Sequence, residues 1–299
     1  MDLTYWQSLL PESTPLSMIN LPGTHDSCTQ YINLSPISRC QNKSISHQIE
    51  TGTRFLDIRL ELRESRFYAV HGIADCRTAK KRKSHLLCFD DVFMVLKQFI
   101  EKHPTEAVIV LLNEGRGNNG DVFFNAFYEQ FVEPYFSSWY LENRIPFLTE
   151  CRGKLVLARR CGLGKSKRVF TDQNTGLNFS KWPDQGSKES FLPGSCQFES
   201  LNGNTAQTSA VIQDRYMFNP KTKWEKVLKA ALEKTNPDEK TIFINYFSTA
   251  GAPFLPFLNA RYINAKFKSY ELISKRIYGW IVLDFQSADL NEKIINSNL

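Results

Sequence analysis

The sequence lacks any long hydrophobic run. Its longest apolar stretches, residues 107–112 and 254–258, are far shorter than the roughly 20 residues that a membrane-spanning helix needs. The first residues show neither the basic start nor the apolar centre of a signal peptide. We therefore expect a soluble protein, located in the cytoplasm or secreted without a visible signal peptide.

Paired cysteine motifs are also missing. The chain has seven cysteines, an odd number, and none of them forms a CxxC pair: Cys28, Cys40, Cys76, Cys88, Cys151, Cys161 and Cys196. This pattern argues against a disulfide framework and against a structural zinc site. We expect a reducing compartment, in which cysteine fills ordinary core positions.

Charge of one sign is not in large excess, because the formal net charge is only +6 over 299 residues. Much of that excess lies in one short segment that contains Arg77, Lys80, Lys81, Arg82 and Lys83. Such a cluster is either a solvated surface or a contact for an anionic membrane or a phosphorylated ligand. The sequence leaves both interpretations open.

The pattern that is present is an alternation of short apolar runs with amphipathic segments. Strands are predicted at residues 17–21, 54–62, 67–71, 107–113, 154–160, 210–215, 241–247 and 278–285. Helices are predicted at residues 42–52, 89–102, 121–135, 221–234 and 262–275. This order predicts an α/β fold, a distorted TIM (β/α)8-type barrel formed by a single domain over residues 1–299, with its core at about 15–290.

One connection is too short for a parallel barrel. Only residues 63–66 separate the second predicted strand from the third, so these two strands should form an antiparallel hairpin. A turn centred on Glu64 and Ser65 would place His71 near Ile58. Asp57, Arg59 and His71 would then be neighbours across the hairpin.

Two further segments follow predicted strands. Residues 161–209 are rich in Gly, Ser, Asn, Asp and Lys and are longer than an ordinary loop, so we expect them to cover the functional face. Residues 250–258 carry more apolar bulk than a solvated loop needs. They are either a loop packed onto the body of the protein or a rim that touches a membrane.

Polar side chains gather where the predicted strands end. The first strand is predicted to stop at Pro22 and Gly23, which places His25 at the junction of a strand and a loop. In a barrel of this kind the active site lies at the carboxyl ends of the strands. The residues expected there are His25, Asp26, Asp57, Arg59, His71, Asn113, Glu114, Arg159, Arg160, Tyr246 and Asp284.

Two histidines, an arginine and several carboxylates can carry out displacement at a phosphodiester. One imidazole takes a proton from the attacking oxygen, the other gives a proton to the leaving oxygen, and the guanidinium stabilises the phosphoryl oxygens. Asp57, Glu114, His25 and His71 could instead ligate a divalent metal. Arg59 favours the first interpretation, because it places a fixed cation where a metal would act.

Three segments together resemble a known family. Residues 21–27 (LPGTHDS), 55–59 (FLDIR) and 70–72 (VHG), in this order and spacing, are similar to the catalytic X region of phosphatidylinositol-specific phospholipases C. The metal-independent bacterial type is the most similar, since calcium-dependent members carry an acidic metal ligand where this chain has Arg59. The resemblance therefore implies a lyase without a metal cofactor.

The resemblance also implies a role for each residue of the motifs. His25 would be the general base for the inositol 2-hydroxyl, and His71 the general acid for the diacylglycerol oxygen. Arg59 would bind the phosphate. Asp284 would orient His25, Asp26 would be the partner of His71, and Asp57 would position Arg59. The products would be diacylglycerol and a cyclic inositol 1,2-phosphate.

Substrate contacts and partners follow from the same resemblance. Arg160, in preference to Arg159, would bind inositol hydroxyls, and Tyr246 would stack on the inositol ring, with Asn113 and Glu114 nearby. Reversible contact with a membrane surface would involve Ile37, Ile45 and residues 254–257. We expect phosphatidylinositol or a related inositol lipid as substrate, no nucleic-acid partner, and a monomer.

Two alternatives remain open at this point. The first is a calcium-dependent phosphodiesterase of the same fold. The second is a catalytically inactive barrel that binds a lipid head group or a protein, because a fold does not fix a function.

Overall fold

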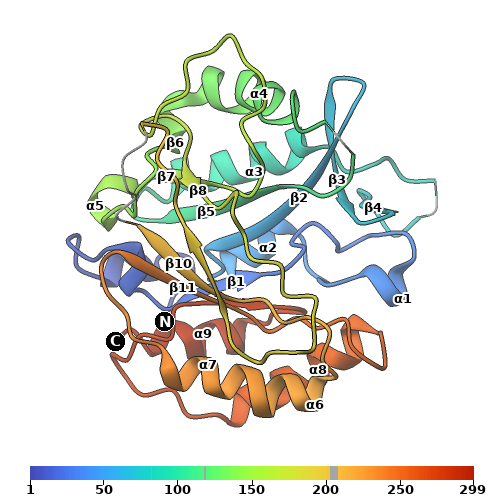
Figure 1. Ribbon diagram of the computed structural model, residues 1–299, viewed down its shortest axis with the longest axis vertical. Helices are drawn as coiled ribbons and strands as arrows, with labels where there is room; N and C mark the ends of the chain where they lie inside the picture. The colour runs from blue at the N-terminus through green and yellow to red at the C-terminus, as the bar shows by residue number, and fades with distance from the viewer. Residues whose placement is uncertain (82, 118, 203–207) are drawn as a thin grey trace.

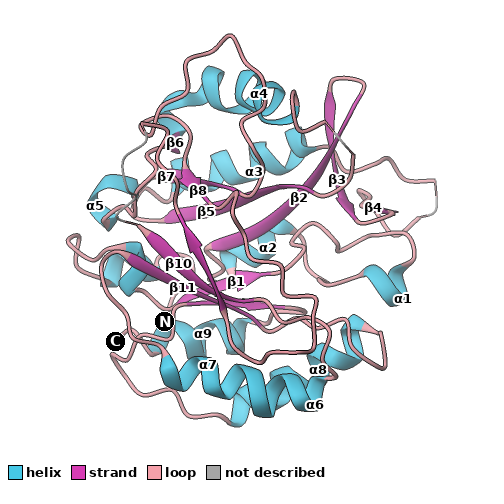
Figure 2. Ribbon diagram, in the orientation of Figure 1, coloured by secondary structure: helices cyan, strands magenta, loops and turns pink. Residues whose placement is uncertain are grey.

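A curved sheet of mostly parallel strands forms the centre of the computed structural model, which describes residues 1–81, 83–117, 119–202 and 208–299 (Figures 1 and 2). Arg82, part of the basic segment, and residues 203–207 of the long segment 161–209 lie outside the described residues. The strands are β1 (Leu21–Thr24), β2 (Phe55–Arg63), β3 (Arg66–His71), β4 (Ala74–Asp75), β5 (Ala107–Glu114), β6 (Trp139–Tyr140), β7 (Lys154–Arg159), β8 (Leu177–Asn178), β9 (Gly194–Gln197), β10 (Ser209–Gln213), β11 (Thr241–Tyr246) and β12 (Trp280–Leu283).

The strand order makes this sheet an open barrel. The order runs β6-β7-β5-β2-β1-β12-β11-β10-β9, and neighbours along this path are parallel except β9, which is antiparallel to β10. Among the described residues, no hydrogen-bonded ladder joins β9 to β6 or β8, so the barrel is not closed at that seam. The predicted α/β class and distorted TIM-type architecture are confirmed.

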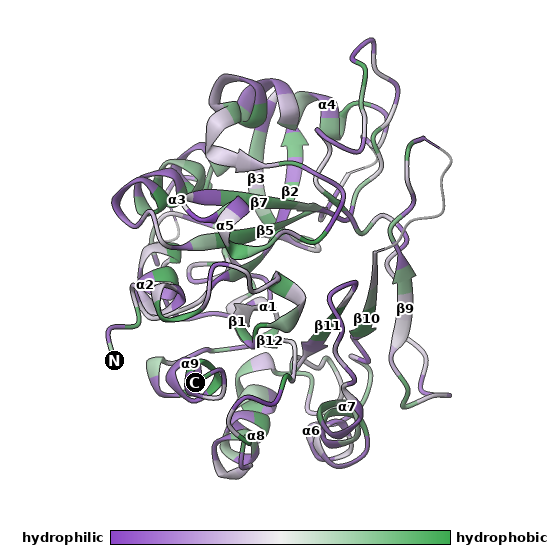
Figure 3. Ribbon diagram, turned by 90° about the vertical axis from the view of Figure 1, so that its left-hand side faces the viewer, coloured by the Kyte–Doolittle hydropathy of each residue, from purple (hydrophilic) through white to green (hydrophobic). Residues whose placement is uncertain are grey.

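Helices cover the outside of the sheet. They are α1 (Ser35–Ser38), α2 (Ile45–Glu50), α3 (Phe89–Lys102), α4 (Phe123–Phe127), α5 (Leu148–Cys151), α6 (Pro220–Thr222), α7 (Lys229–Lys234), α8 (Pro256–Ser269) and α9 (Ala288–Asn296). Figure 3 shows hydrophobic residues along β5, β7 and β10 and mixed hydropathy on the outer helices. In α3, whose predicted bounds are confirmed, apolar residues three and four apart, among them Phe93, Leu96 and Ile100, are buried.

Other helix predictions needed adjustment. The predicted helices 121–135 and 221–234 each contain a π-helical stretch, at Tyr128–Val132 and Lys223–Leu228. The predicted helix 262–275 is Pro256–Ser269 instead, because Pro256 occupies the first helical position, where a missing N–H costs nothing. Segment 250–258 is therefore only partly a loop.

The first predicted strand was wrong in its position along the chain. Residues Leu16–Met18 form a 3-10 helix, and β1 begins only at Leu21. Pro22 and Gly23 belong to the strand and are not a turn: the Pro22 carbonyl accepts a hydrogen bond of 2.9 Å from the Arg54 N–H. A Cβ at Gly23 would lie 2.9 Å from Phe55 Cδ1, so glycine allows two parallel strands to approach. His25 still follows the end of the strand.

The hairpin prediction is confirmed. β2 and β3 are antiparallel, with pairs from Leu60 with Ala69 to Arg63 with Arg66. Glu64 and Ser65 form the turn, both with positive φ, 48° and 64°. The ladder ends before Ile58, and His71 pairs with Ala74 of β4.

Residues near both ends of the chain are buried. Trp6 and Ile295 are both 1% exposed and pack in the same hydrophobic cluster. All seven cysteines are free. Within the described part of the chain, no helix has both the length and the apolar character needed to cross a membrane.

Candidate active site

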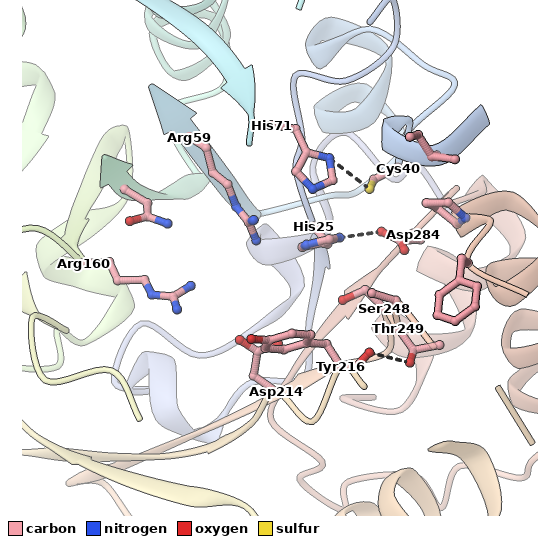
Figure 4. Close-up of a pocket in the computed structure, with 15 residues that line it drawn as sticks. His25, Cys40, Arg59, His71, Arg160, Asp214, Tyr216, Ser248, Thr249 and Asp284 are labelled. Atoms are coloured by element: carbon pink, nitrogen blue, oxygen red, sulfur yellow. Dashed lines mark hydrogen bonds and ion pairs between the residues drawn. The ribbon is translucent and has the colours of Figure 1, made fainter. Parts of the chain in front are cut away.

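A cavity of about 370 Å³ opens at the carboxyl ends of the parallel strands (Figure 4). Most of the polar residues in the cavity wall lie at or just beyond the ends of strands, so the sheet positions them. The wall contains His25, Cys40, Arg59, His71, Asn113, Arg160, Asp214, Tyr216, Ser248, Thr249 and Asp284, with Ile37, Ala250, Phe254 and Pro256 as its apolar part.

His25 lies between two carboxylates. Its Nδ1 is 2.8 Å from Asp284 Oδ1, and its Nε2 is 3.0 Å from Asp26 Oδ2. Both carboxylates are almost fully buried, and the His25 side chain is 14% exposed. Burial alone would lower the pKa of His25, but Asp26 and Asp284 outweigh it and raise the pKa to about 9. In the ligand-free protein at neutral pH this imidazole is therefore protonated.

This protonation predicts how stability depends on pH. The native pKa of His25, about 9, exceeds the ordinary value of 6.5, so the native state binds the proton more tightly than the unfolded state does. The stabilisation is complete below pH 6.5 and is lost as the pH rises through 9. We expect urea unfolding to show a decline on the order of 3 kcal/mol over this window.

His25→Gln should remove most of that decline. A matched control is His47→Gln, on the exposed surface of α2, which should keep the native profile. Parallel profiles for the native chain and His25→Gln would show that His25 is not the group that loses the proton.

Asp26 connects both histidines to the arginine. Its Oδ2 is also 3.2 Å from His71 Nε2, and its Oδ1 is 3.0 Å from Arg59 Nε. The sequence predicted Asp26 only as the partner of His71. On the other side of that ring, His71 Nδ1 lies 2.7 Å from the Ser38 carbonyl, so Nδ1 donates its hydrogen there. This fixed orientation leaves Nε2 directed at Asp26.

Arg59 supplies a permanent cation. Its Nη2 lies 2.9 Å from Asp57 Oδ2, and Asp57 is fully buried. Burial opposes the charge on Arg59, but Asp26 and Asp57 raise its pKa well above the usual value. In return, Arg59 overcomes the effect of burial on Asp57 and lowers the pKa of that carboxyl. The predicted pairing of Asp57 with Arg59 is present.

The same region contains possible metal-ligand sets. Three groups bring ligand atoms within 4.8 Å of one another: His25, Cys40 and Asp284; Asp26, Cys40 and His71; and His25, Asp26 and Asp57. Arg59 already neutralises Asp26 and Asp57. Glu114, a predicted alternative ligand, accepts the Asn119 N–H at 2.7 Å and is not part of the cavity wall. The donor set is thus better matched to a fixed guanidinium than to a divalent ion.

The two arginines at the end of β7 have different surroundings. Arg160 lines the cavity, and its guanidinium carbon lies 4.4 Å from the Trp182 ring centre. Arg159 is 2% exposed, donates to the Cys161 carbonyl at 3.1 Å, and has a pKa lowered to about 10 by burial. Of the two, only Arg160 can reach a ligand in the cavity.

Tyr246 occupies a different position from the one its predicted role requires. It is fully buried, and its ring plane is nearly perpendicular to those of His25 and Trp182, with ring centres 5.8 and 5.7 Å away. Such a ring has no free face on which a ligand could stack. Tyr216, 38% exposed, and Asp214 line the cavity instead.

Sequence reasoning missed Asp214 and Tyr216, although they carry the same signal as the others: polar residues at the end of a predicted strand. Behind them lies Lys223, fully buried, whose Nζ donates to Gln213 Oε1 and to the Arg215 carbonyl, both at 2.8 Å. Burial lowers the pKa of Lys223 to about 7. These two hydrogen bonds hold the chain on either side of Asp214. Figure 4 shows Asp214 and Tyr216 in the cavity wall.

Comparison with known proteins gives similarity over the full chain. No family model matches the chain. A 1-phosphatidylinositol phosphodiesterase of Listeria monocytogenes is 25% identical over 309 residues, which cover 98% of this chain and 84% of the relative. The protein of the same name from Staphylococcus aureus strain Newman is 25% identical over 316 residues, covering 98% and 93%.

Solved structures agree with this similarity. A phosphatidylinositol-specific phospholipase C from S. aureus, with a pentafluoro-Phe incorporated, has a TM-score of 0.77 at 21% identity and covers 100% of this chain and 98% of its own. The L. monocytogenes phosphatidylinositol-specific phospholipase C has a TM-score of 0.75 at 24% identity, with 100% of both chains covered. The predicted fold, and the resemblance of the chain to bacterial phosphatidylinositol-specific phospholipases C, are confirmed.

Proposed function

We propose that this chain is a phosphatidylinositol-specific phospholipase C that cleaves its substrate into diacylglycerol and a cyclic inositol 1,2-phosphate. The observation that carries the proposal is one cavity in which two imidazoles and a guanidinium surround the carboxylate of Asp26. Acid, base and phosphate-binding cation are thus within reach of a single phosphodiester. The full-length similarity to curated 1-phosphatidylinositol phosphodiesterases supports the same substrate class.

The proposed reaction uses each group once. Because its pKa is about 9, His25 acts as the base only in the fraction of molecules in which it has lost its proton to solvent, and this fraction grows as the pH rises. In that neutral form, held through Nδ1 by Asp284, it accepts the proton of the inositol 2-hydroxyl at Nε2 as that oxygen bonds to phosphorus. Arg59 stabilises the charge on the phosphoryl oxygens, with Asp57 fixing its position. His71 gives the proton on Nε2 to the glycerol oxygen as its bond to phosphorus breaks. The ring closes on the inositol and diacylglycerol leaves.

The inositol ring is proposed to lie between Arg160, Asp214 and Tyr216. The guanidinium and the carboxylate can hydrogen-bond to ring hydroxyls, and Tyr216 offers a partly exposed ring face. Asn113 is a further polar contact in the wall. Arg159, Tyr246 and Glu114 are left without direct contact because they do not line the cavity.

Reversible membrane contact is proposed for the rim of the cavity. Ile37, Phe254, Phe257 and Leu258 are 59%, 64%, 50% and 42% exposed, more apolar surface than a solvated edge needs. Ile45, also predicted to touch a membrane, is 7% exposed and belongs to the core. A similar S. aureus phosphatidylinositol-specific phospholipase C was solved to address modulation of its membrane binding, which supports this mode of contact.

A monomer without a nucleic-acid partner remains our prediction.

The decisive experiment measures water-soluble inositol phosphate released from phosphatidylinositol vesicles, with and without excess chelator. We expect release that chelator does not reduce, because Arg59 provides the cationic function. Loss of activity in chelator, restored by calcium, would indicate the metal-dependent alternative. A folded protein that releases nothing from any inositol lipid would indicate a binding module.

A further inference from the structure

A second cavity, of about 460 Å³, shares helix α1 with the candidate active site. Ile37 of α1 lines the catalytic cavity, whereas Ser35 and the following Arg39 line the second one. Its opposite wall is the segment after β4, with Arg77, Ala79, Lys80 and Lys81. We call this space the basic cavity.

The basic cavity concentrates cations that no carboxylate of the described residues neutralises. Within the residues described, none of Arg39, Arg77, Lys80 and Lys81 has a carboxylate oxygen within 4.0 Å, whereas Asp75 nearby is occupied by Arg63 and Arg116. An adjoining cavity of about 220 Å³ is also lined by Arg77 and has a further cation, Lys43, in its wall. Among the described residues that line this adjoining cavity, Asp91 is the one acidic residue.

The cavity is held in shape rather than formed by loose lysines. The Arg77 guanidinium donates to the Ser84 carbonyl at 2.7 Å, and the Arg77 N–H donates to the Tyr31 carbonyl at 2.6 Å. The first bond fixes the segment after β4, and the second connects the two walls, because Tyr31 also lines the cavity. Arg39 is anchored 5.8 Å from the Phe285 ring. The described residues that line the basic cavity include no carboxylate that could pair with its cations. Because the cations are already held in place, the cavity is suited to bind an anionic ligand.

The position of the basic cavity identifies the source of that anion. Leu34 and Ile37 are 48% and 59% exposed, and Ile73, between β3 and β4, is 81% exposed. The Phe285 ring that Arg39 approaches lies 5.3 Å from the ring of Phe257, which belongs to the apolar rim. Figure 1 shows α1 and β4 on the same side of the molecule. Apolar side chains beside these cations match the acyl chains and phosphates of one lipid layer.

We propose that the basic cavity binds the phosphodiester head group of an anionic phospholipid, a second lipid bound beside the substrate. This inference rests on the proposed function, in that the membrane is where the substrate lies. The proposal also predicts a membrane preference that the catalytic site does not explain. The protein should bind a surface that contains an anionic phospholipid more tightly than a neutral surface, even when that lipid is not phosphatidylinositol.

The test measures vesicle binding without catalysis. Sucrose-loaded vesicles of phosphatidylcholine, alone or with phosphatidylglycerol as a minor component, are sedimented with the native chain and with Arg77→Gln/Lys80→Gln/Lys81→Gln. We expect the triple variant to bind the mixed vesicles about tenfold more weakly than the native chain, and the pure vesicles equally well. High salt should remove the difference, because it screens the cations.

A matched control removes equal charge elsewhere. Lys102, Lys234 and Lys240 are exposed and precede β5 and β11, at the end of the barrel opposite the cavity. Their replacement by Gln should change binding to mixed vesicles less than about twofold. Since Arg77 also bonds to backbone, Lys80→Gln/Lys81→Gln is a second variant that keeps those bonds and should show a smaller loss of the same kind.

Hydrolysis of a short-chain phosphatidylinositol below its micelle concentration separates the two proposals. The variant with Arg77, Lys80 and Lys81 replaced should cleave this monomeric substrate at the native rate. The basic cavity is not a lipid site if the cavity variant and the control variant weaken binding to mixed vesicles equally, or if the cavity variant binds them as tightly as the native chain does. Loss of hydrolysis of the monomeric substrate in the variant that lacks Arg77 would also contradict the proposal. If the native chain cleaves no inositol lipid but binds mixed vesicles through the basic cavity, the proposed function fails and the lipid site stands.

Discussion

His25→Ala will lower turnover of phosphatidylinositol by about a thousandfold or more. The His25 imidazole has a carboxylate at each ring nitrogen, Asp284 at Nδ1 and Asp26 at Nε2, and Asp26 also contacts the second imidazole, His71. Without it, no base of suitable strength takes the proton from the attacking hydroxyl. The measurement is kcat on mixed micelles that contain phosphatidylinositol.

The two histidines should be distinguishable by the leaving group. His71→Ala should recover much of its activity on an inositol nitrophenyl phosphate, because nitrophenolate leaves without a proton, whereas His25→Ala should not recover. The double variant should be little worse than either single one, since the groups act as a unit. His47→Ala, outside the cavity, is the control and should keep native activity. Equal recovery of both variants on the activated substrate would contradict the assignment of base and acid.

Arg59→Ala will impair both activity and stability. We expect a loss of about a thousandfold in kcat, because the guanidinium is the cation that we place nearest the reacting phosphate. Asp57, fully buried, would lose the partner that lies 2.9 Å away. Leaving such a charge unpaired costs on the order of 3–5 kcal/mol, so urea unfolding should show a clear destabilisation.

A companion variant separates the two effects. Arg59→Ala combined with Asp57→Asn removes the unpaired charge of Asp57, whereas Asp26, the other partner of Arg59, still contacts His25 and His71. The double variant should therefore recover most of the stability and none of the activity. Arg59→Lys keeps the charge but not the two-pronged geometry, and we expect an intermediate kcat. If the double variant regains activity, Arg59 serves only to neutralise Asp57 and does not act on the phosphate.

Local sequence patterns were sufficient for several elements. The spacing of apolar residues predicted α3 at its observed bounds, because a helix face depends on residues close in the chain. The four-residue connection between two strands predicted the β2–β3 hairpin for the same reason. His25 could be placed near Asp57 and Arg59 because the carboxyl ends of parallel strands meet at one edge, and His71 could be added through the hairpin.

Other features depend on contacts between distant segments. Pro22 and Gly23 have the composition of a turn, and only the close approach of Phe55 explains why they are part of β1. The Ser38 carbonyl that orients His71 comes from 33 residues away, and no motif marks a backbone atom. The basic cavity likewise requires two segments that are distant in the sequence to face each other across a backbone hydrogen bond from Arg77 to Tyr31.

By itself, the sequence determined the α/β alternation, the hairpin and the candidates for acid, base and cation, since these follow from residue type and short spacing. The tertiary structure decided which side chains face the cavity. Arg159 and Arg160 are adjacent and point to opposite sides of a strand, so only the curvature of the sheet settles that Arg160 faces inward to the cavity. The same curvature buries Tyr246 and brings Asp214 and Tyr216 to the cavity wall. Because the curvature depends on packing around the whole barrel, the sequence of a single strand cannot predict these positions.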